Sequence, residues 1–248
     1  MRILGLIPAR YASTRFPGKP LVMIDGKTMI QRVYEQALKC DRLSNVVIAT
    51  DNETIFNHIG LFKGKALMTG SFHRSGTERC HEAVEILRKH RDEYDYVINI
   101  QGDEPFINPE QIRQLADCFA YRETLLATLI KKITHHGEIS DPNVVKVTID
   151  KNGSALLFSR SPIPYTRGKE VESWLSGTTY YKHVGIYGYQ SMVLDDLINL
   201  PETPLERAES LEQLRWIEHG FRIKTRLTEF ESVSIDIPSD LLKITNRT

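Results

Sequence analysis

Short apolar segments alternate with helical patterns through the first 150 residues of this 248-residue chain. Strands are predicted at the aliphatic runs too short for a helix, namely residues 3–7, 46–50, 66–68 and 96–100. Helices are predicted from Thr28, where apolar residues through Leu38 share one face, and over residues 78–89 and 109–120. Because parallel strands need such crossovers, the alternation predicts an α/β fold with a mainly parallel sheet covered on both faces.

The second part of the chain has a different pattern. Residues 144–149 and 155–159 flank the sequence Asp-Lys-Asn-Gly, which predicts a β-hairpin, and residues 180–189 alternate as another strand. A helix is predicted over residues 204–219, ended by Gly220 in the position that favours a left-handed residue. We therefore expect a single domain over residues 1–248 with a β-rich insertion at roughly 130–190.

Composition excludes several classes of protein. Lys plus Arg and Asp plus Glu number 32 each, which argues against a nucleic acid as the partner because such binding rests on a basic excess. The three cysteines contain no Cys-x-x-Cys pair, so no disulfide framework is expected. No apolar run approaches the roughly 18 residues of a membrane span, and no signal-peptide pattern is visible. These features predict a cytoplasmic protein without membrane insertion.

A cluster of cations and hydroxyls follows the first predicted strand. Arg10, Ser13, Arg15 and Lys19 lie within ten residues, with Gly18 among them. Ligands bind at the carboxyl ends of parallel strands, and arginine and lysine contact phosphate oxygens. The pattern is neither Gly-x-Gly-x-x-Gly nor a P-loop. It predicts a site for a small anion, although an exposed, solvated basic loop would have the same composition.

A second cluster, Gln101-Gly-Asp103-Glu104-Pro105, follows the strand at residues 96–100. An aspartate at a strand end suits Mg²⁺ held by one or two carboxylates together with substrate phosphates. The alternative is an aspartate that closes a turn before the helix capped by Asn108. Since both clusters follow parallel strands, they should share one edge of the sheet, and this favours a ligand site.

Acidic residues also recur on the helix predicted at residues 204–219. Glu206, Glu209 and Gln213 would fall on one stripe, which favours ligand contact because carboxylates on a mostly buried helix need partners. Glu206 alone also fits a capping box that begins at Thr203. For His183 considered alone, a packed strand residue is the more common outcome.

These motifs keep their order from about residue 3 to 242 and resemble the 3-deoxy-manno-octulosonate cytidylyltransferase (CMP-Kdo synthetase) family. The matching segments are IPARYASTRFPGKPL, HRSGTER, NIQGDEP, NVVKV, LFSRSPIPY, KHVGIYGY, PLERAESLEQLRW and IDIPSDL. The first segment alone would indicate only a cytidylyltransferase of some kind, whereas SGTER, QGDEP and HxGIYGY indicate the Kdo branch. The resemblance implies a mainly parallel, Rossmann-like nucleotidyltransferase sheet and a homodimer formed through the β-rich insertion.

The resemblance also implies roles for individual residues. Arg10, Ser13 and Lys19 would hold the phosphates of CTP, and Asp103 and Asp236 would bind Mg²⁺. The pocket for nucleotide or sugar would be lined by Arg74, Ser75, Gln101, His183, Tyr187, Glu206 and Glu209, with Gln101, His183 and Tyr187 on the Kdo side. Catalysis would rest on Arg10, Lys19, Asp103 and Asp236 as a sugar hydroxyl attacks the α-phosphorus and pyrophosphate leaves. The product would serve lipopolysaccharide assembly.

Two residues depart from the family pattern, Lys182 in place of a common arginine and Ile237 in place of a threonine. Ile237 lacks the hydroxyl of a good N-cap residue, which should weaken that cap by about 1 kcal/mol. Two alternative functions stay open. One is a cytidylyltransferase for another acceptor, such as sialic acid, an amino-substituted Kdo or methylerythritol phosphate. The other is a non-catalytic sensor of nucleotide sugars on the same scaffold.

Overall fold

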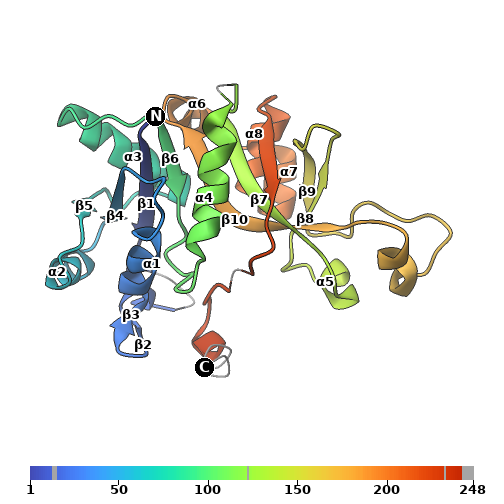
Figure 1. Ribbon diagram of the computed structural model, residues 1–248, viewed down its shortest axis with the longest axis horizontal. Coiled ribbons are helices and arrows are strands. Elements are labelled where there is room, and N and C mark those ends of the chain that lie inside the picture. Colours follow the sequence, from blue (N-terminus) through green and yellow to red (C-terminus); the bar gives the residue numbers. More distant parts are fainter. Residues whose placement is uncertain (13–15, 122, 232, 242–248) are drawn as a thin grey trace.

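The computed structural model describes residues 1–12, 16–121, 123–231 and 233–241. Within these residues, a nine-stranded sheet forms the centre of the molecule, with helices on both faces (Figure 1). Its strands are β1 (Ile3–Ala9), β4 (Asn45–Thr50), β5 (Ala66–Met68), β6 (Tyr96–Asn99), β7 (Leu126–Lys132), β8 (Lys146–Ile149), β9 (Ala155–Ser159), β10 (Tyr181–Gln190) and β11 (Ile223–Leu227). The short strands β2 (Met23–Ile24) and β3 (Lys27–Thr28) form a separate hairpin.

The main path of the sheet has the order β11-β7-β10-β6-β1-β4-β5. β1 pairs in parallel with β4 on one side and with β6 on the other, and β7 pairs in parallel with β11. On this path β10 runs against the other strands, because it is antiparallel to both β6 and β7. The predicted mainly parallel α/β sheet is confirmed. After β1 the chain continues to β4 and β5 on one side and then crosses to β6 on the other, so the carboxyl end of β1 lies at a switch point, where such sheets bind ligands.

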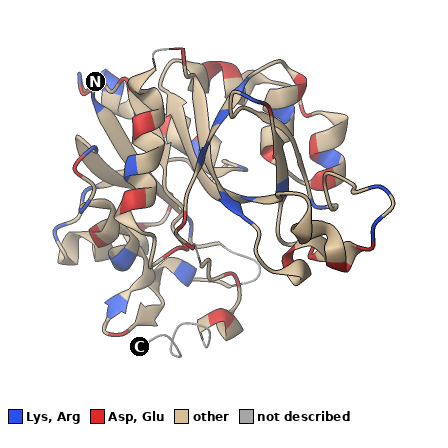
Figure 2. Cartoon of the chain, turned by 45° about the vertical axis from the view of Figure 1, so that its right-hand side comes forward, with Lys and Arg blue, Asp and Glu red and all other residues tan. Residues whose placement is uncertain are grey.

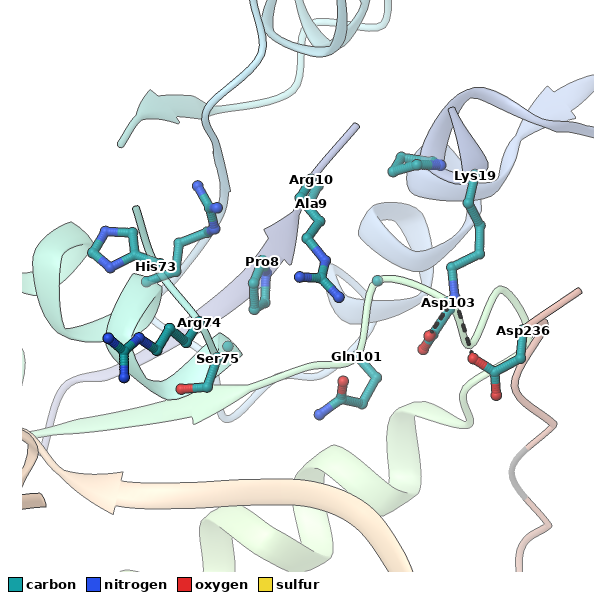
Figure 3. A pocket seen from close by; sticks show the side chains of 14 residues that line it. Pro8, Ala9, Arg10, Lys19, His73, Arg74, Ser75, Gln101, Asp103 and Asp236 are labelled. Atoms are coloured by element: carbon teal, nitrogen blue, oxygen red, sulfur yellow. Dashed lines mark hydrogen bonds and ion pairs between the residues drawn. The ribbon is translucent and has the colours of Figure 1, made fainter. Parts of the chain in front are cut away.

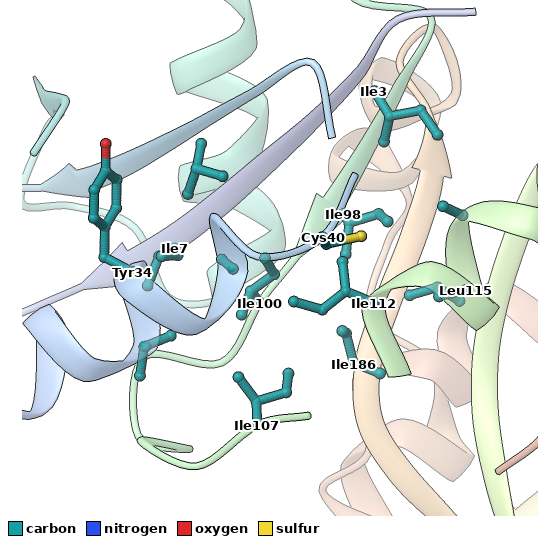
Figure 4. Packing of buried hydrophobic residues seen from close by; sticks show 14 of the residues in the cluster. Ile3, Ile7, Tyr34, Cys40, Ile98, Ile100, Ile107, Ile112, Leu115 and Ile186 are labelled. Atoms are coloured by element: carbon teal, nitrogen blue, oxygen red, sulfur yellow. The ribbon is translucent and has the colours of Figure 1, made fainter. Parts of the chain in front are cut away.

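Side chains of β1 alternate between two hydrophobic cores. Ile3 and Ile7 pack on the face covered by α1 (Met29–Ala37), α2 (Glu53–Leu61) and α4 (Pro109–Asp117), as Figure 4 shows. Leu4 and Leu6 pack on the opposite face, under α3 (Gly76–Lys89), α6 (Val193–Asn199) and α8 (Glu212–Glu218). All four side chains are fully buried, and burial of one such side chain contributes about 1.5–3 kcal/mol. Two apolar faces on one strand explain why β1 lies in the middle of the sheet.

Several predicted helices are confirmed, and two details are wrong. Asn108 caps α4 in a capping box, and Ser75 caps α3 by accepting from the backbone N–H of Glu78. Leu38, predicted on the buried face of its helix, is 55% exposed because α1 ends at the preceding residue. The helix predicted at residues 109–120 is α4 followed by a 3-10 turn, η2 (Cys118–Ala120).

The single helix predicted at residues 204–219 is wrong. Two helices, α7 (Pro204–Glu209) and α8, are separated by Ser210, whose φ of 51° is left-handed. The break turns Leu211 into the core, where it is 7% exposed, and points Glu212 toward α3. As a result, the side chains of Glu206, Glu209 and Gln213 do not share one helical stripe.

The predicted hairpin is confirmed as β8 and β9. Oδ1 of Asp150 accepts from the backbone N–H groups of Asn152 and Ser154, and Gly153 supplies the left-handed residue with a φ of 74°. β8 also pairs with β10, so the hairpin extends the central sheet. The following residues 160–180 form an arm that projects from the side of the molecule in Figure 1. In this arm, η3 (Val171–Ser176) packs on α5 (His136–Ser140) through a small core that contains Trp174.

Charge is spread evenly over the elements. Figure 2 shows basic and acidic residues interspersed, in keeping with the formal net charge of zero. In the part of the chain that the structure describes, no helix combines the length and the apolar character that crossing a bilayer requires.

Candidate functional site

A pocket lies at the carboxyl ends of β1 and β6 (Figure 3). Seven residues chosen from the sequence line it, contributed by four separate segments of the chain: Arg10, Lys19, Arg74, Ser75, Gln101, Asp103 and Asp236. The first two come from the loop after β1, the next two from the start of α3, two from the loop after β6, and the last from the C-terminal segment. The expectation that the loops after β1 and β6 share one edge of the sheet is therefore confirmed. Ser13 lies outside the described residues.

Lys19 lies between the two aspartates of the pocket. Its ammonium nitrogen is 2.7 Å from Oδ2 of Asp103 and 3.6 Å from Oδ1 of Asp236 (Figure 3). Lys19 begins the 3-10 turn η1 (Lys19–Leu21), and the left-handed Gly18 directly before it redirects the chain into the pocket. The side chains of Lys19 and Asp103 are only 15% and 26% exposed, so solvent screens this pair incompletely. One cation thus faces two carboxylates in the pocket.

Close contact between two loops brings Asp103 to this place. A Cβ atom on Gly102 would lie 2.8 Å from the backbone oxygen of Pro8, so only glycine lets the loop after β6 lie against β1. The backbone N–H of Ile235 donates to the backbone oxygen of Asp103 at 3.0 Å, which brings the C-terminal segment alongside. Asp236 reaches the pocket because Ile235, the residue before it, is bonded to the loop after β6.

The N-terminus of α3 forms another wall of the pocket. Ser75 is its N-cap, and the carboxylate of Glu78 accepts from the backbone N–H of Arg74 at 2.7 Å. Arg74 is exposed at this end of the helix. Backbone N–H groups and the helix dipole favour anions at such an N-terminus. This wall can therefore receive negative charge, as can the exposed Arg10 of the loop after β1.

Glu212 connects this wall to α8. Its Oε1 accepts from the hydroxyl of Ser75 and its Oε2 from the hydroxyl of Thr77, both at 2.8 Å. Burial raises the pKa of Glu212 above its usual range, partly offset by these two hydroxyl donors. Sequence reasoning did not select Glu212, because the fold brings it to Ser75 across 137 residues.

His73 and Arg79 also line the pocket and were not selected from the sequence. Arg79 is buried and donates to Oδ2 of Asp51 and to the hydroxyl of Thr69, so it fixes the loops after β4 and β5. The ring of His73 contacts the carboxylate of Glu82. Both residues stand in the motif HRSGTER, so the signal that identifies them was present in the sequence.

Gln101 joins the pocket to β10. Its side-chain amide donates to the backbone oxygen of Gly185 at 2.8 Å, within an irregular stretch of β10 between Val184 and Tyr187. The two predicted residues of this strand, His183 and Tyr187, do not line the pocket but lie next to each other, with ring centroids 5.1 Å apart.

Aromatic rings surround His183 and Tyr187. The ring of Phe158 lies 5.1 Å from that of His183, and the ring of Trp216 lies 5.1 Å from that of Tyr187. Burial lowers the pKa of His183 to about 3, so its imidazole is neutral at physiological pH. Its Nε2 is 2.9 Å from the hydroxyl of Thr128, which donates to a backbone oxygen of β10 and so accepts from the imidazole. The buried hydroxyl of Tyr187 has no hydrogen-bond partner among the described residues.

The structure places Glu206 and Glu209 outside the pocket. Arg215 donates to both carboxylate oxygens of Glu206 at 2.6 and 2.5 Å, and the backbone N–H of Thr203 donates to Oε2 of Glu206 at 3.4 Å, which is one half of the predicted capping box. Glu209 accepts from the backbone N–H of Arg160 at 2.9 Å, and from the hydroxyl of a serine in β9. These contacts hold α7 to its neighbours, and the contacts of both glutamates with a substrate stay predictions.

Comparison with known proteins agrees with this geometry. A family model described as cytidylyltransferase matches residues 4–225. The 3-deoxy-manno-octulosonate cytidylyltransferase of Parabacteroides distasonis is 51% identical over 247 residues, which cover 98% of this chain and 96% of the relative. The enzyme of that name from Bacteroides thetaiotaomicron is 49% identical over 97% of this chain and 96% of its own length.

Solved structures show the same fold. CMP:2-keto-3-deoxy-manno-octonic acid synthetase in complex with CTP has a TM-score of 0.90 and 41% identity, with 100% of this chain and 98% of the other covered. A 4-diphosphocytidyl-2C-methyl-D-erythritol synthase from Anaerococcus prevotii, 12% identical with a TM-score of 0.63 and 99% and 98% coverage, shares the fold alone. The chain belongs to the cytidylyltransferase family, in its 3-deoxy-manno-octulosonate cytidylyltransferase branch.

Proposed function

We propose that this protein transfers CMP from CTP to 3-deoxy-D-manno-octulosonate (Kdo), with release of pyrophosphate, for lipopolysaccharide biosynthesis. The observation that carries the proposal is the position of Lys19 between Asp103 and Asp236, beside the N-terminus of α3. This arrangement offers positive groups for a triphosphate next to carboxylates that suit its usual metal ion. Relatives that are about half identical over nearly the whole chain carry the name of this activity.

The chain's own residues supply electrostatic stabilisation. Arg10 and Lys19 line the side of the pocket formed by the loop after β1, where they would bind the leaving pyrophosphate oxygens. Arg74 and Ser75, at the N-terminus of α3, would hold the nucleotide from the opposite wall. Groups fixed in a folded pocket need no reorganisation when charge develops in the transition state, and this is the main source of rate enhancement in phosphoryl-type transfers.

Asp103 and Asp236 fit a Mg²⁺ ion. Both carboxylates already face one cation, the ammonium of Lys19, and magnesium prefers one or two carboxylates together with substrate phosphates. When bound, the ion supplies charge neutralisation and lowers the pKa of an attacking hydroxyl. Lys19 would then turn from the carboxylates to the phosphates, because a flexible ammonium can exchange one anionic partner for another.

We assign the sugar to the region beside β10. Gln101 lines the pocket and is bonded to Gly185, so it lies between the nucleotide side and the strand that carries His183 and Tyr187. A neutral imidazole and a buried phenol hydroxyl without a protein partner suit a hydroxylated ligand. Glu206 and Glu209 would take part after their present contacts with Arg215 and Arg160 rearrange.

We also propose a cytoplasmic homodimer. The arm at residues 160–180 projects from the body, and its Tyr165 is 74% exposed. This aromatic side chain is a candidate contact for a second copy of the chain. The proposed nucleotide substrate supports a cytoplasmic location, and the three buried cysteines, which are free thiols in this structure, are compatible with it.

Pyrophosphate release tests the proposed function. The purified protein should release pyrophosphate only when CTP, Mg²⁺ and Kdo are all present, and omission of any one should abolish the signal. ATP or GTP in place of CTP should give poor rates. A sensor of nucleotide sugars would bind CTP or CMP-Kdo but release no pyrophosphate, and that result would reject the catalytic proposal.

A further inference from the structure

The C-terminal segment that carries Asp236 is held in place by contacts of Ile235, the residue directly before it. Ile235 is fully buried in a small core with Ile24 and Met29, against which Leu241 also packs. The backbone N–H of Ile235 donates to the backbone oxygen of Asp103 at 3.0 Å. These contacts place the chain beside the pocket. They do not by themselves set the direction of the Asp236 carboxylate, whose own side chain is 41% exposed.

A second contact fixes the backbone of Asp236 itself and of the residue after it. Asp240 is 6% exposed, and its Oδ2 accepts from the backbone N–H of Asp236 at 2.8 Å and from that of Ile237 at 3.0 Å. Asp240 is the third residue of the 3-10 turn η4 (Pro238–Leu241), and Ile237 directly precedes that turn. This is the half of a capping box in which the third residue of the turn reaches back to the N-cap backbone.

The other half of the capping box cannot form in this chain. It needs a hydroxyl, amide or carboxylate on the N-cap side chain, and Ile237 has an aliphatic side chain that is 42% exposed. The side-chain part of the cap therefore comes from Asp240. A carboxylate that binds two consecutive N–H groups holds the peptide on both sides of residue 236, which limits rotation of the backbone that presents the Asp236 carboxylate.

We propose that Asp240 is a positioning residue for Asp236. It holds the Asp236 carboxylate toward Lys19, 3.6 Å away, and beside Asp103, in the direction that the proposed Mg²⁺ site requires. The inference rests on the proposed function, since it assigns Asp236 as a metal ligand. Partners that orient a ligand residue commonly change metal affinity or activity by about 10- to 100-fold when removed. Asp240 touches neither substrate nor metal in this role.

The test compares Asp240→Ala and Asp240→Asn with the wild type, and with Ser239→Ala as a matched control at an exposed position of the same turn. One readout is the Mg²⁺ concentration that gives half-maximal turnover. The other is the rise in Tm that Mg²⁺ causes with CTP bound and no sugar present, which needs no catalysis. An asparagine keeps one neutral acceptor oxygen, so it should preserve part of the contact.

We expect half-saturating Mg²⁺ to rise in the order wild type, Asp240→Asn, Asp240→Ala, with roughly a tenfold increase for alanine. The Mg²⁺-dependent rise in Tm should shrink in the same order, while KM for Kdo stays within about twofold and Ser239→Ala matches the wild type. If the alanine variant does not fold, the Mg²⁺ response of Asp240→Asn is compared with that of the wild type instead. Equal Mg²⁺ responses in all variants, or a lower Tm with an unchanged Mg²⁺ response, would overturn the proposal.

Two further variants separate this inference from the proposed function. Ile237→Thr adds an N-cap hydroxyl that accepts from N–H groups inside the turn and not from those of Asp236 and Ile237, so in the Asp240→Ala background it should not recover the Mg²⁺ response. Recovery of the response would show that stability of the turn, and not the carboxylate contact with Asp236, is what matters. Asp236→Ala tests the metal site itself. If Asp236→Ala also leaves the Mg²⁺ response unchanged, the proposed metal site is wrong. If the Asp240 variants leave it unchanged but Asp236→Ala alters it, only the positioning role of Asp240 is wrong.

Discussion

The ammonium nitrogen of Lys19 lies 2.7 Å from Oδ2 of Asp103, although 84 residues separate the two in the sequence. The contact joins the loop after β1 to the loop after β6, which lie next to each other because the two strands are paired in parallel. Lys19 also lies 3.6 Å from Asp236, so one ammonium group faces two carboxylates from distant segments. Predictions for Asp103 and Lys19 follow directly from this arrangement.

Asp103→Asn should abolish turnover and leave the fold intact. The amide is nearly isosteric with the carboxylate but carries no charge, so it should impair metal binding selectively. Steady-state pyrophosphate release at saturating Mg²⁺ measures the effect, with a thermal melt as the control for folding. A variant that keeps a substantial share of wild-type turnover would show that Asp103 is not a metal ligand.

Lys19→Met should lower kcat/KM for CTP by roughly 10- to 100-fold, because a charge-assisted contact with a phosphate contributes about 1.5–3 kcal/mol. KM for Kdo should change little. Without Mg²⁺, Tm should fall by about 2–4 °C, since the two aspartates lose a partner and a partly exposed ion pair contributes up to about 1 kcal/mol. Mg²⁺ should restore most of that loss. If kcat/KM decreases by less than about threefold, Lys19 does not contact the phosphates of CTP.

His183→Gln should make stability less sensitive to acid. The folded state holds the pKa of His183 at about 3, against 6.5 for the free group, so between these pH values the unfolded chain binds a proton that the folded chain does not. The free energy of unfolding therefore falls as pH decreases through this window, by about 1–2 kcal/mol between pH 7 and 5 from this group. Glutamine keeps an N–H donor for Thr128 without titrating.

Urea unfolding at pH 7 and pH 5 measures this difference. The exposed His219 gives a matched control, His219→Gln, which should keep the pH dependence of the wild type. If His183→Gln loses as much stability on acidification as the wild type does, His183 titrates normally in the folded protein and its burial has no energetic consequence.

Local patterns predicted the features that depend on neighbours in the sequence. The apolar run of β1, the Asn108 cap and the contact of Glu206 with the backbone N–H of Thr203 are confirmed, because each rests on contacts within a few residues. The loops after β1 and β6 were placed on one edge by the rule for parallel strands. That rule needs only the order of strands and helices along the chain.

Contacts that the three-dimensional fold creates were not accessible in the same way. No local rule joins Ser75 to Glu212 across 137 residues. The break at Ser210 also follows from packing. The periodic sequence around it allows one helix, and the burial of Leu211 in the core favours two.

Ser210→Gly should raise stability slightly. A non-glycine residue in the left-handed region costs about 1–2 kcal/mol, and glycine avoids this while losing some entropy on folding, so a gain of up to about 1 kcal/mol is expected. Differential scanning calorimetry measures it, with Ser239→Gly as a control outside the break. A clear fall in Tm for Ser210→Gly alone would mean that the serine side chain makes a stabilising contact at the break.

Identification of the product tests the transfer reaction itself. The protein is incubated with CTP, Mg²⁺ and Kdo, and the nucleotide sugar and pyrophosphate are quantified by mass spectrometry and a coupled assay, with sialic acid as a parallel acceptor. The expected result is CMP-Kdo and pyrophosphate in equal amounts, little product with sialic acid, and none with Asp103→Asn. Absence of CMP-Kdo from the wild-type reaction, or equal transfer to sialic acid, would contradict the proposed function.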